Sequence, residues 1–310
     1  MLRVRVVSGL VALLAAAAVL GGCGSAAISP TAPASAGPPL SKLAQVPAGS
    51  HTALIVLENH EFDEVIGASD APYLNELASQ GALATNFYAI THPSLPNYLA
   101  LFAGSTFGIE ENCSGCLASG ANLATQLSAA SVSWRAYIGA MPSACFTGAE
   151  AGKYAKKHNP FMYFPSVTAN PSLCARVVPE ARLQADLARG RLPAFAWITP
   201  DLCQAAHDCA FGSADQYLRE VVPRLRRQLG PNGLLAITFD EGTTSAGCCG
   251  GAAGGHIATV LLGPEVRRGF RLRGQYSLYS LLATVEDRFG VARLGHARGA
   301  PALGAAFSTE

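Results

Sequence analysis

Ser94 lies in a turn whose residue types favour nucleophilic chemistry. Pro93 and Pro96 flank it, and each proline fixes its own backbone and restricts the residue before it. The apolar run that follows, up to Gly104, predicts a short helix, so the Ser94 hydroxyl would lie at or near a helix N-terminus, which favours anions. Ser94 is therefore a candidate nucleophile towards a phosphate or acyl group, although an N-cap serine without a chemical role fits the turn equally well.

Polar side chains follow several apolar runs at the points where strands are predicted to end. Glu58 and Asn59 follow one such run, and Asp240 and Glu241 follow another. Ligands bind outside the carboxyl ends of parallel strands, so these oxygen atoms are expected to meet at one edge of a sheet. Together with a Ser94 oxygen they predict a hard, oxygen-rich site for a divalent cation.

A second group of side chains has mixed nitrogen and oxygen ligands. Asp201 and His207 follow another predicted strand, and His256 lies just before a further one. Such a ligand set is more typical of zinc. Each of these residues taken alone also fits an ordinary loop position.

A cation beside a serine predicts phosphate-ester chemistry. The cation would lower the pKa of the Ser94 hydroxyl and offset the charge of a transferring phosphoryl group. Acyl hydrolysis by a Ser-His-Asp triad is the alternative, but the Gly-x-Ser-x-Gly elbow is missing around Ser94. The many carboxylates would also repel an oxyanion. Phosphate-ester hydrolysis is therefore favoured.

The elements that must position these residues alternate between strands and helices. Continuous apolar strands between helices predict an α/β fold with a mostly parallel sheet covered on both faces. Strands are expected over 53–57, 82–89, 132–138, 194–198, 234–239 and 257–262, and helices over 71–80, 121–130, 181–189, 214–229 and 277–289.

The N-terminal part of the chain predicts export. Residues 1–23 have two arginines, an apolar stretch too short for a stable membrane span, and a Leu-Gly-Gly-Cys ending that resembles the lipobox of bacterial lipoproteins. A lipid on Cys23 would anchor the protein to the membrane; the alternative is an ordinary secretory signal. Residues 24–50 are rich in Ala, Ser and Pro and predict a tether, which leaves 51–310 as the catalytic domain.

Charge and cysteine content agree with an exported enzyme. Lysine and arginine number 22 against 21 acidic residues, without a basic block, which argues against nucleic-acid binding. Eight cysteines remain besides Cys23, an even number that fits four disulfides in an oxidising compartment. Structural bridges are expected between Cys113 and Cys116 and across the loop from Cys203 to Cys209. The adjacent pair 248–249 is expected either to bond elsewhere or to form a vicinal bridge.

Several motifs in order resemble the bacterial phosphoesterase family of the alkaline phosphatase-like superfamily, which contains acid phosphatases and phospholipases C. The order and spacing are most similar to its short secreted members with phosphatidylinositol 3-phosphatase activity. The motifs are Glu58-Asn59-His60-Glu61-Phe62-Asp63, Thr91-His92-Pro93-Ser94-Leu95-Pro96-Asn97-Tyr98, Lys157-His158-Asn159-Pro160-Phe161, Asp240-Glu241-Gly242 and Gly255-His256.

The resemblance implies a three-layer α/β/α sandwich with a metal held by Glu58, Asn59, Asp240 and Glu241. It also implies that Ser94, rather than Thr91, is the nucleophile, because the superfamily's phosphodiesterases carry their catalytic hydroxyl before an x-Pro-Asn turn. In the same comparison Asn97 would bind a phosphate oxygen, and Lys157 would supply charge near the phosphate. The side chains that would bind phosphate or protonate the leaving oxygen are His92, His158 and His207.

One departure from the family pattern concerns the substrate. The family often has Ser-His-Tyr before its last helix, where this chain has Leu278 between Ser277 and Tyr279. The sequence as a whole predicts an exported, metal-assisted phosphomonoesterase with a Zn, Mg or Ca ion, acting on a phosphate ester such as a phosphoinositide or another phospholipid. The alternatives are a phospholipase C-type phosphodiesterase and a catalytically silent surface lipoprotein that binds phosphate or a cation.

Overall fold

The computed structural model describes residues 50–308. The predicted signal segment 1–23, its lipid-bearing Cys23 and nearly all of the 24–50 tether lie outside the described residues. No described helix combines the length and the apolar character that crossing a membrane requires.

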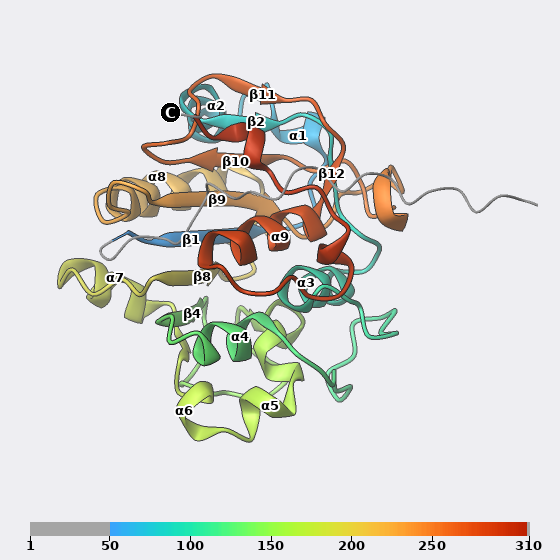
Figure 1. Ribbon diagram of the computed structural model, residues 1–310, viewed down its shortest axis with the longest axis vertical. Helices are drawn as coiled ribbons and strands as arrows, with labels where there is room; N and C mark the ends of the chain where they lie inside the picture. Colours follow the sequence, from blue (N-terminus) through green and yellow to red (C-terminus); the bar gives the residue numbers. More distant parts are fainter. Residues whose placement is uncertain (1–49, 309–310) are drawn as a thin grey trace, which may run out of the picture. The chain divides into compact units, whose positions relative to one another are not determined.

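An eight-stranded sheet forms the centre of the fold (Figure 1). Its central strands are apolar and buried at every position, as expected for a sheet covered on both faces. In spatial order the strands are β11 (Phe270–Leu272), β2 (Ala82–Ala84), β10 (Thr259–Leu262), β9 (Leu234–Phe239), β1 (Thr52–Leu57), β8 (Phe195–Thr199), β4 (Trp134–Ile138) and β7 (Val177–Pro179). All neighbours are parallel except β10, which runs antiparallel to both β2 and β9.

Helices cover both faces of the sheet, which confirms the predicted α/β class. In Figure 1, α3, α4 and α9 lie in front of the strands, while α2 and α8 lie behind them. The helices are α1 (Phe62–Val65), α2 (Pro72–Gln80), α3 (Ser94–Ala103), α4 (Leu123–Ala129), α5 (Pro165–Thr168), α6 (Pro171–Cys174), α7 (Ala181–Ala188), α8 (Gly212–Arg226) and α9 (Leu278–Phe289). The short 3-10 turns are η1 (Lys156–His158), η2 (Pro160–Tyr163), η3 (Cys249–Gly251), η4 (Gly295–Arg298) and η5 (Gly304–Ala306).

The predicted strand over 82–89 is wrong in its extent. The chain leaves the large sheet after β2, and residues Phe87–Tyr88 form β3, which pairs with β12 (Tyr276–Ser277) in a separate two-stranded sheet. The change of sheet is fixed by hydrogen bonds: the Thr85 N–H donates to the Leu272 carbonyl, and the Tyr276 N–H donates to the Asn86 carbonyl. The remaining predicted helices and strands are present, with ends shifted by a few residues. The last two-stranded piece is a hairpin of β5 (Glu150–Ala151) and β6 (Tyr154–Ala155).

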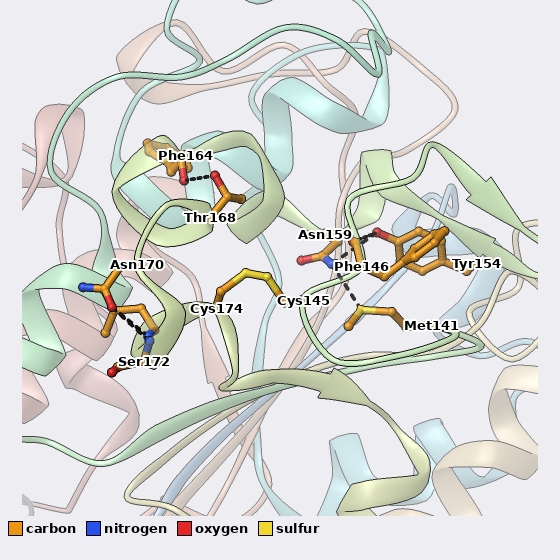
Figure 2. The surroundings of a disulfide bond; sticks show 11 residues. Met141, Cys145, Phe146, Tyr154, Asn159, Phe164, Thr168, Asn170, Ser172 and Cys174 are labelled. Atoms are coloured by element: carbon orange, nitrogen blue, oxygen red, sulfur yellow. Dashed lines mark hydrogen bonds between the residues drawn. A yellow bond between two sulfur atoms is a disulfide. The ribbon is translucent and has the colours of Figure 1, made fainter.

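Three disulfides close loops in the middle of the chain. Two of them, Cys113–Cys116 and Cys203–Cys209, are bridges that the sequence predicts, and the third joins Cys145 to Cys174. Figure 2 shows this third bridge, which ties the segment after β4 to the end of α6. Within residues 50–308, Cys248 and Cys249 are free thiols, so the expectation of a fourth bridge through this pair is wrong.

Candidate active site at the carboxyl edge of the sheet

Two buried carboxyl groups follow neighbouring strands. Leu57 pairs with Phe239 in the register of β1 and β9, so Glu58 and Asp240 are the next residues on adjacent strands. Both side chains are buried. Burial is the main cause that raises the pKa of Glu58 to about 8, against the opposing effects of the Tyr98 hydroxyl and the Lys157 charge. The strand register thus brings together two acids that are difficult to ionise without a cation.

The pKa of Asp240 is also raised well above its usual range. Burial is the first cause, and the nearby Glu58 and Glu241 carboxylates add to it. One oxygen, Oδ1, accepts hydrogen bonds from the backbone N–H of Asn59 at 3.2 Å and of Glu241 at 2.7 Å. Within the described residues, the other oxygen, Oδ2, has no hydrogen-bond partner. The free oxygen of Asp240 is therefore available to a ligand.

Glu58 has the same division between a bonded oxygen and a free one. Its Oε1 accepts a hydrogen bond from the Tyr98 hydroxyl at 2.5 Å. Its Oε2 lies 3.1 Å from Nε2 of His158, but in the described part of the chain neither atom has a hydrogen-bond partner of suitable geometry. Tyr98 comes from α3, one turn beyond Ser94, so the helix that carries the candidate nucleophile also orients this carboxylate.

His158 and His207 complete this group. Burial, followed by the electrostatic effect of the nearby Lys157 and His207 side chains, lowers the pKa of His158 well below its usual range, so the ring is neutral and its lone pair is free to bind a cation. The ring stacks on Tyr98 with centroids 5.3 Å apart. Ligand atoms of Glu58, His158 and His207 all lie within 4.8 Å of one another.

His207 also connects the group to a lysine. Its Nε2 lies 2.9 Å from Nζ of Lys157, and its Nδ1 lies 2.6 Å from Oδ1 of Asp208. Because a protonated lysine donates to Nε2, the ring proton lies on Nδ1, and this N–H donates a hydrogen bond to the Asp208 carboxylate. The sequence predicts His207 as a cation ligand with Asp201 and His256, and the family resemblance places it with His92 and His158 near the phosphate. Neither prediction groups it with Glu58.

Ser94 lies beside the acids through a direct hydrogen bond to Glu241. The Ser94 hydroxyl donates to Oε1 of Glu241 at 2.9 Å, and the other carboxylate oxygen of Glu241 contacts Nδ1 of His92. Nε2 of His92 lies 2.8 Å from the Thr244 carbonyl. Burial lowers the pKa of His92, but the hydrogen bonds to Thr244 and Glu241 outweigh it and raise the pKa above its usual value. Glu241 therefore accepts from a hydroxyl and from a ring that is readily protonated.

Asn97 fixes the turn before Ser94. Its amide oxygen accepts hydrogen bonds from the backbone N–H groups of Ile90 and Thr91, at 2.8 and 3.0 Å. Its amide nitrogen donates to the carbonyls of Thr91 and Pro93, at 2.6 and 3.2 Å. The two N–H donors and the oxygen of this fully buried amide are all hydrogen-bonded to the backbone, so its bonding capacity is used. The family resemblance implies instead that Asn97 binds a phosphate oxygen.

The contacts of Asp201 and His256 lie outside this group. Oδ1 of Asp201 accepts from the backbone N–H groups of Cys203 and Gln204, each at 2.9 Å, and so closes the start of the bridged loop. The ring of His256 stacks between Phe62 and Tyr88, with its Nε2 3.0 Å from the Thr85 carbonyl. Because β10 is antiparallel, His256 does lie at the edge where β9 ends, as the sequence suggests. The structure does not bring it together with Asp201 and His207 into a group of cation ligands among the described residues.

Glu61 is a supporting residue to which the sequence analysis gives no role. Its Oε1 accepts from the backbone N–H and the hydroxyl of Thr244, at 2.8 and 2.6 Å, and its Oε2 accepts from the backbone N–H of His256 at 2.9 Å. A Cβ on Gly242 would lie 2.6 Å from Oε1 of Glu61, and a Cβ on Gly255, where φ is 99°, would lie 2.6 Å from the Gly242 Cα. Two glycines are therefore required where the start and the end of the connection between β9 and β10 lie against each other.

The α/β architecture of the molecule is shared with solved structures of alkaline phosphatase-like proteins. A solved structure of a protein in the alkaline phosphatase superfamily from Vibrio parahaemolyticus superposes with a TM-score of 0.56 at 14% identity, over 81% of this chain and 69% of that one. At this identity the likeness establishes the shared fold. It confirms the predicted α/β fold.

Sequence comparison narrows the class to one family. Residues 68–292 match the Phosphoesterase family. The chain is 32% identical to a phosphatidylinositol-3-phosphatase of Mycobacterium tuberculosis over 262 residues, 83% of each chain. It is also 32% identical to an acid phosphatase of Aspergillus fumigatus, over 77% of this chain and 54% of that protein, so it spans about half the length of the fungal relative. The chain belongs to the Phosphoesterase family and is a hydrolase of phosphoric esters.

Proposed function

We propose that the protein is an exported phosphomonoesterase that uses Ser94 and a divalent cation to hydrolyse phosphate esters. The observation that carries this proposal is a group of buried ligand atoms on Glu58, Asp240 and His158 that have no partner within residues 50–308 and lie beside the Ser94–Glu241 hydrogen bond. Buried carboxylates without compensating charge are costly, and a bound cation removes that cost.

Glu58, Asp240 and His158 are the residues that we assign to hold the cation, and His207 lies beside them. The mixture of carboxylate oxygens and an imidazole nitrogen fits zinc, and a more oxygen-rich set that includes Glu241 and Asn59 would fit Mg²⁺ or Ca²⁺. When bound, the cation supplies positive charge that offsets the negative charge developing on the phosphoryl group.

The proposed reaction has two displacement steps at phosphorus. In the first, the Ser94 hydroxyl gives its proton to Glu241, its oxygen forms a bond to phosphorus, and the bond from phosphorus to the alcohol oxygen breaks. The alcohol oxygen receives a proton from the Lys157 ammonium group, which lies 2.9 Å from Nε2 of the partly exposed His207. In the second step, the oxygen of a water molecule forms a bond to phosphorus, and the bond from phosphorus to the Ser94 oxygen breaks. The Ser94 oxygen takes its proton back from Glu241, a proton of the water goes to the Lys157 amine, and phosphate leaves.

Three further residues have supporting roles in this proposal. His92 holds the Glu241 carboxylate in place and, once protonated, adds positive charge near Ser94. Lys157 supplies charge for the phosphate oxygens. Asn97 positions the turn rather than contacting substrate, because both ends of its amide are already bonded to the backbone.

The substrate class follows from relatives and stays part of the proposal. The mycobacterial relative is named for action on a phosphoinositide, and the fungal relatives are named acid phosphatases. Phosphomonoesters, with a phosphoinositide monoester among them, are therefore the proposed substrates. Leu278, which replaces the family histidine, is fully buried at the start of α9, so it supplies packing where the family carries a polar ring.

The decisive experiment compares phosphate release from three substrates by the mature full-length protein. The substrates are p-nitrophenyl phosphate, bis-p-nitrophenyl phosphate and vesicles that contain phosphatidylinositol 3-phosphate, each with and without chelator and added metal. Turnover of the monoesters, lost on chelation and restored by one metal, is the expected result. Preference for the diester would instead support a phospholipase C-type enzyme, and no release by folded protein would support a binding protein.

Two variants make this experiment specific to the site. Glu58→Gln keeps the volume of the side chain and removes a cation ligand, and Ser94→Ala removes the nucleophile. The matched controls are Glu76→Gln and Ser79→Ala, which make the same changes on exposed positions of α2. Equal losses in the site variants and their controls would contradict the assignment.

Export and anchoring are separate parts of the proposal. They are supported by the basic and apolar N-terminal segment, the Leu-Gly-Gly-Cys ending, and the three disulfides of the described domain. Mass spectrometry of the membrane-extracted protein would detect a lipid on Cys23. Release of the protein from the membrane by Cys23→Ala is the expected result, and unlipidated protein in the medium would point to ordinary secretion.

A further inference from the structure

A hollow whose chemistry differs from that of the proposed active site lies at the opposite edge of the sheet. It has a volume of about 600 Å³, within the range of ligand pockets. Its walls come from the segments just before β4, β7 and β8 and from the end of α4. Because these three strands are parallel, the hollow lies at their amino ends, whereas the proposed active site lies at the carboxyl ends. The lining residues are Ser128, Ser131, Val132, Ser133, Trp134, Arg135, Arg176, Arg191, Leu192 and Pro193.

Three arginines give the hollow a positive charge. Among the described residues that line it, none is acidic. Arg135 is paired through Nη1 with Asp186, behind the wall, but its Nε is buried without a hydrogen-bond partner in the described part of the chain. Arg191 is exposed and Arg176 is half-buried, and neither has a carboxylate partner within residues 50–308. Two uncompensated guanidinium groups therefore face one cavity.

The wall holds one of these guanidinium groups in a defined position. The Arg176 guanidinium lies over the Trp134 ring, 5.4 Å from its centroid, in the geometry of a cation–π contact. Its Nη1 lies 3.5 Å from the Ser128 hydroxyl, which also accepts the Trp134 indole N–H at 2.8 Å. Trp134 is almost fully buried, so it offers a rigid platform.

The backbone on either side of Arg176 is fixed as well. Its carbonyl accepts the Ala136 N–H at 3.0 Å, which joins the start of β7 to β4. The Cys145–Cys174 disulfide anchors the chain two residues earlier (Figure 2). A side chain that is bonded, stacked and tethered in this way loses little entropy on binding a ligand.

We propose that this hollow is a second anion-binding site that takes a phosphate group. Guanidinium groups form paired hydrogen bonds to phosphate oxygens, and the exposed hydroxyls of Ser131 and Ser133 can contribute at the rim. The volume exceeds that of inorganic phosphate alone, so the phosphate of a lipid head group also fits. The proposal does not depend on the function proposed for the carboxyl edge.

Tryptophan fluorescence provides a direct test, because the chain has only two tryptophans. Trp197→Phe removes the one in the core and leaves Trp134 as the reporter in the wall of the hollow. The full-length protein is titrated with inorganic phosphate, and separately with phosphatidylcholine vesicles with and without phosphatidylinositol 3-phosphate. We expect a saturable change whose Kd weakens about tenfold or more in the double variant Arg176→Gln and Arg191→Gln.

The matched control is Arg227→Gln, which removes one positive charge from an exposed position at the end of α8. A response to inorganic phosphate identifies a free-anion site, and a response only to phosphoinositide vesicles identifies a head-group site. No response to either, or equal Kd values in the double variant and the control, would overturn the proposal.

A second measurement does not require the Trp197 substitution. Equilibrium dialysis of the otherwise unchanged chain with radiolabelled phosphate counts the bound anions. One fewer phosphate per chain in the arginine double variant, with phosphatase turnover unchanged, is the expected result. An equal count in both proteins would contradict the site.

Discussion

Two buried carboxylates of this molecule, Asp186 and Glu58, have pKa values shifted in opposite directions. Asp186, on α7, accepts hydrogen bonds from the Tyr137 hydroxyl and from Nε of Arg182, each at 2.9 Å, and pairs with Arg135. Burial raises its pKa, but the hydrogen bonds and the two arginines outweigh burial and lower it. Glu58 has one hydroxyl donor and a neutral ring nearby, and its pKa rises to about 8.

The difference separates a carboxylate with a structural role, Asp186, from one that we propose binds a cation, Glu58. Every oxygen of Asp186 has a partner within the chain, so its charge is already stabilised. In the described part of the chain, Glu58 and Asp240 each have a buried oxygen without a partner, so a bound cation would be needed to stabilise their charge. Substitutions at the two places are therefore expected to affect different properties, namely stability at Asp186 and activity at Glu58.

The largest expected effect is on turnover. Glu58→Gln should reduce kcat/KM by about 10³-fold or more, because it removes a cation ligand beside the nucleophile, and Ser94→Ala should cost at least as much. The stability of the metal-free protein should stay equal or rise in Glu58→Gln, because a carboxylate that repels Asp240 has gone. Initial rates and thermal melts measure the two effects. Lower stability together with full activity would reverse the comparison.

The opposite pattern is expected at Asp186. Asp186→Asn leaves Arg135 and Arg182 without their carboxylate partner, and should lower the free energy of unfolding by about 3 kcal/mol. Turnover should remain within about twofold, because the side chain is remote from Ser94. Denaturant unfolding and initial rates at a temperature where the variant is folded check this expectation. The exposed Asp70→Asn is a suitable control.

Metal binding should stabilise the protein through Glu58 and not through Asp186. A cation at 100 times its Kd adds about 2.7 kcal/mol to the free energy of unfolding, which raises Tm by several degrees. The increase should disappear in Glu58→Gln and persist in Asp186→Asn. Thermal melts with and without zinc, magnesium or calcium measure it. An equal increase in Glu58→Gln would show that the cation binds elsewhere.

A further buried carboxylate extends the comparison to the pH dependence of stability. Glu286, on α9, accepts the Leu294 N–H at 2.8 Å through Oε1, while Oε2 has no partner among the described residues, and burial raises its pKa to about 8. A raised folded-state pKa means that the contribution to stability is complete below the unfolded pKa of 4.5 and is lost as pH rises through about 8.

Glu286→Gln should remove that pH dependence. Relative to the unsubstituted protein, the variant should gain on the order of 2 kcal/mol of stability between pH 5 and pH 8.5. Unfolding curves at both pH values provide the measurement. A pH-independent difference between the two proteins would indicate that Glu286 does not carry the proton.

The smallest expected effect concerns the Tyr98 hydroxyl, which donates a hydrogen bond to Glu58. Tyr98→Phe removes the donor to Oε1 while retaining the ring that stacks on His158. Metal affinity should fall about tenfold, the usual cost of losing a residue that orients a metal ligand. Isothermal titration of the metal-free protein measures the change. Tyr73→Phe, whose ring lies on the far face of the fold beside Arg219, serves as the control.

The fold could be predicted from the sequence because its signals are local. Runs such as the one from Thr52 to Leu57 are apolar at every position, and Gly104 and Gly290 end two helices in the left-handed conformation. The strand predicted over 82–89 failed because the turn at Thr85 and Asn86 is fixed by carbonyls nearly two hundred residues away. The local sequence therefore contains no signal for the break in this strand.

The same distinction applies to the site. Glu58, Asp240, Glu241 and Ser94 could be found because they follow strands or begin a helix. The proximity of His207 to Glu58 could not be predicted, because it depends on how the bridged loop from Cys203 to Cys209 folds back. Nor could composition predict that the Asn97 amide is occupied by its own turn, since its partners are backbone atoms.

The direction of β10 has a consequence for how such a site can change in evolution. Because β10 runs antiparallel to β9, the connection between them leaves and returns at the same edge of the sheet, with the acids at one end and His256 at the other. The tip of this connection, 247–251, lies between contacts that are already fixed at Thr244 and Gly254. Residues can be inserted or removed at this tip without altering the strand order or displacing Asp240. The border of the reaction centre can therefore be remodelled for new substrates while its acids stay in place.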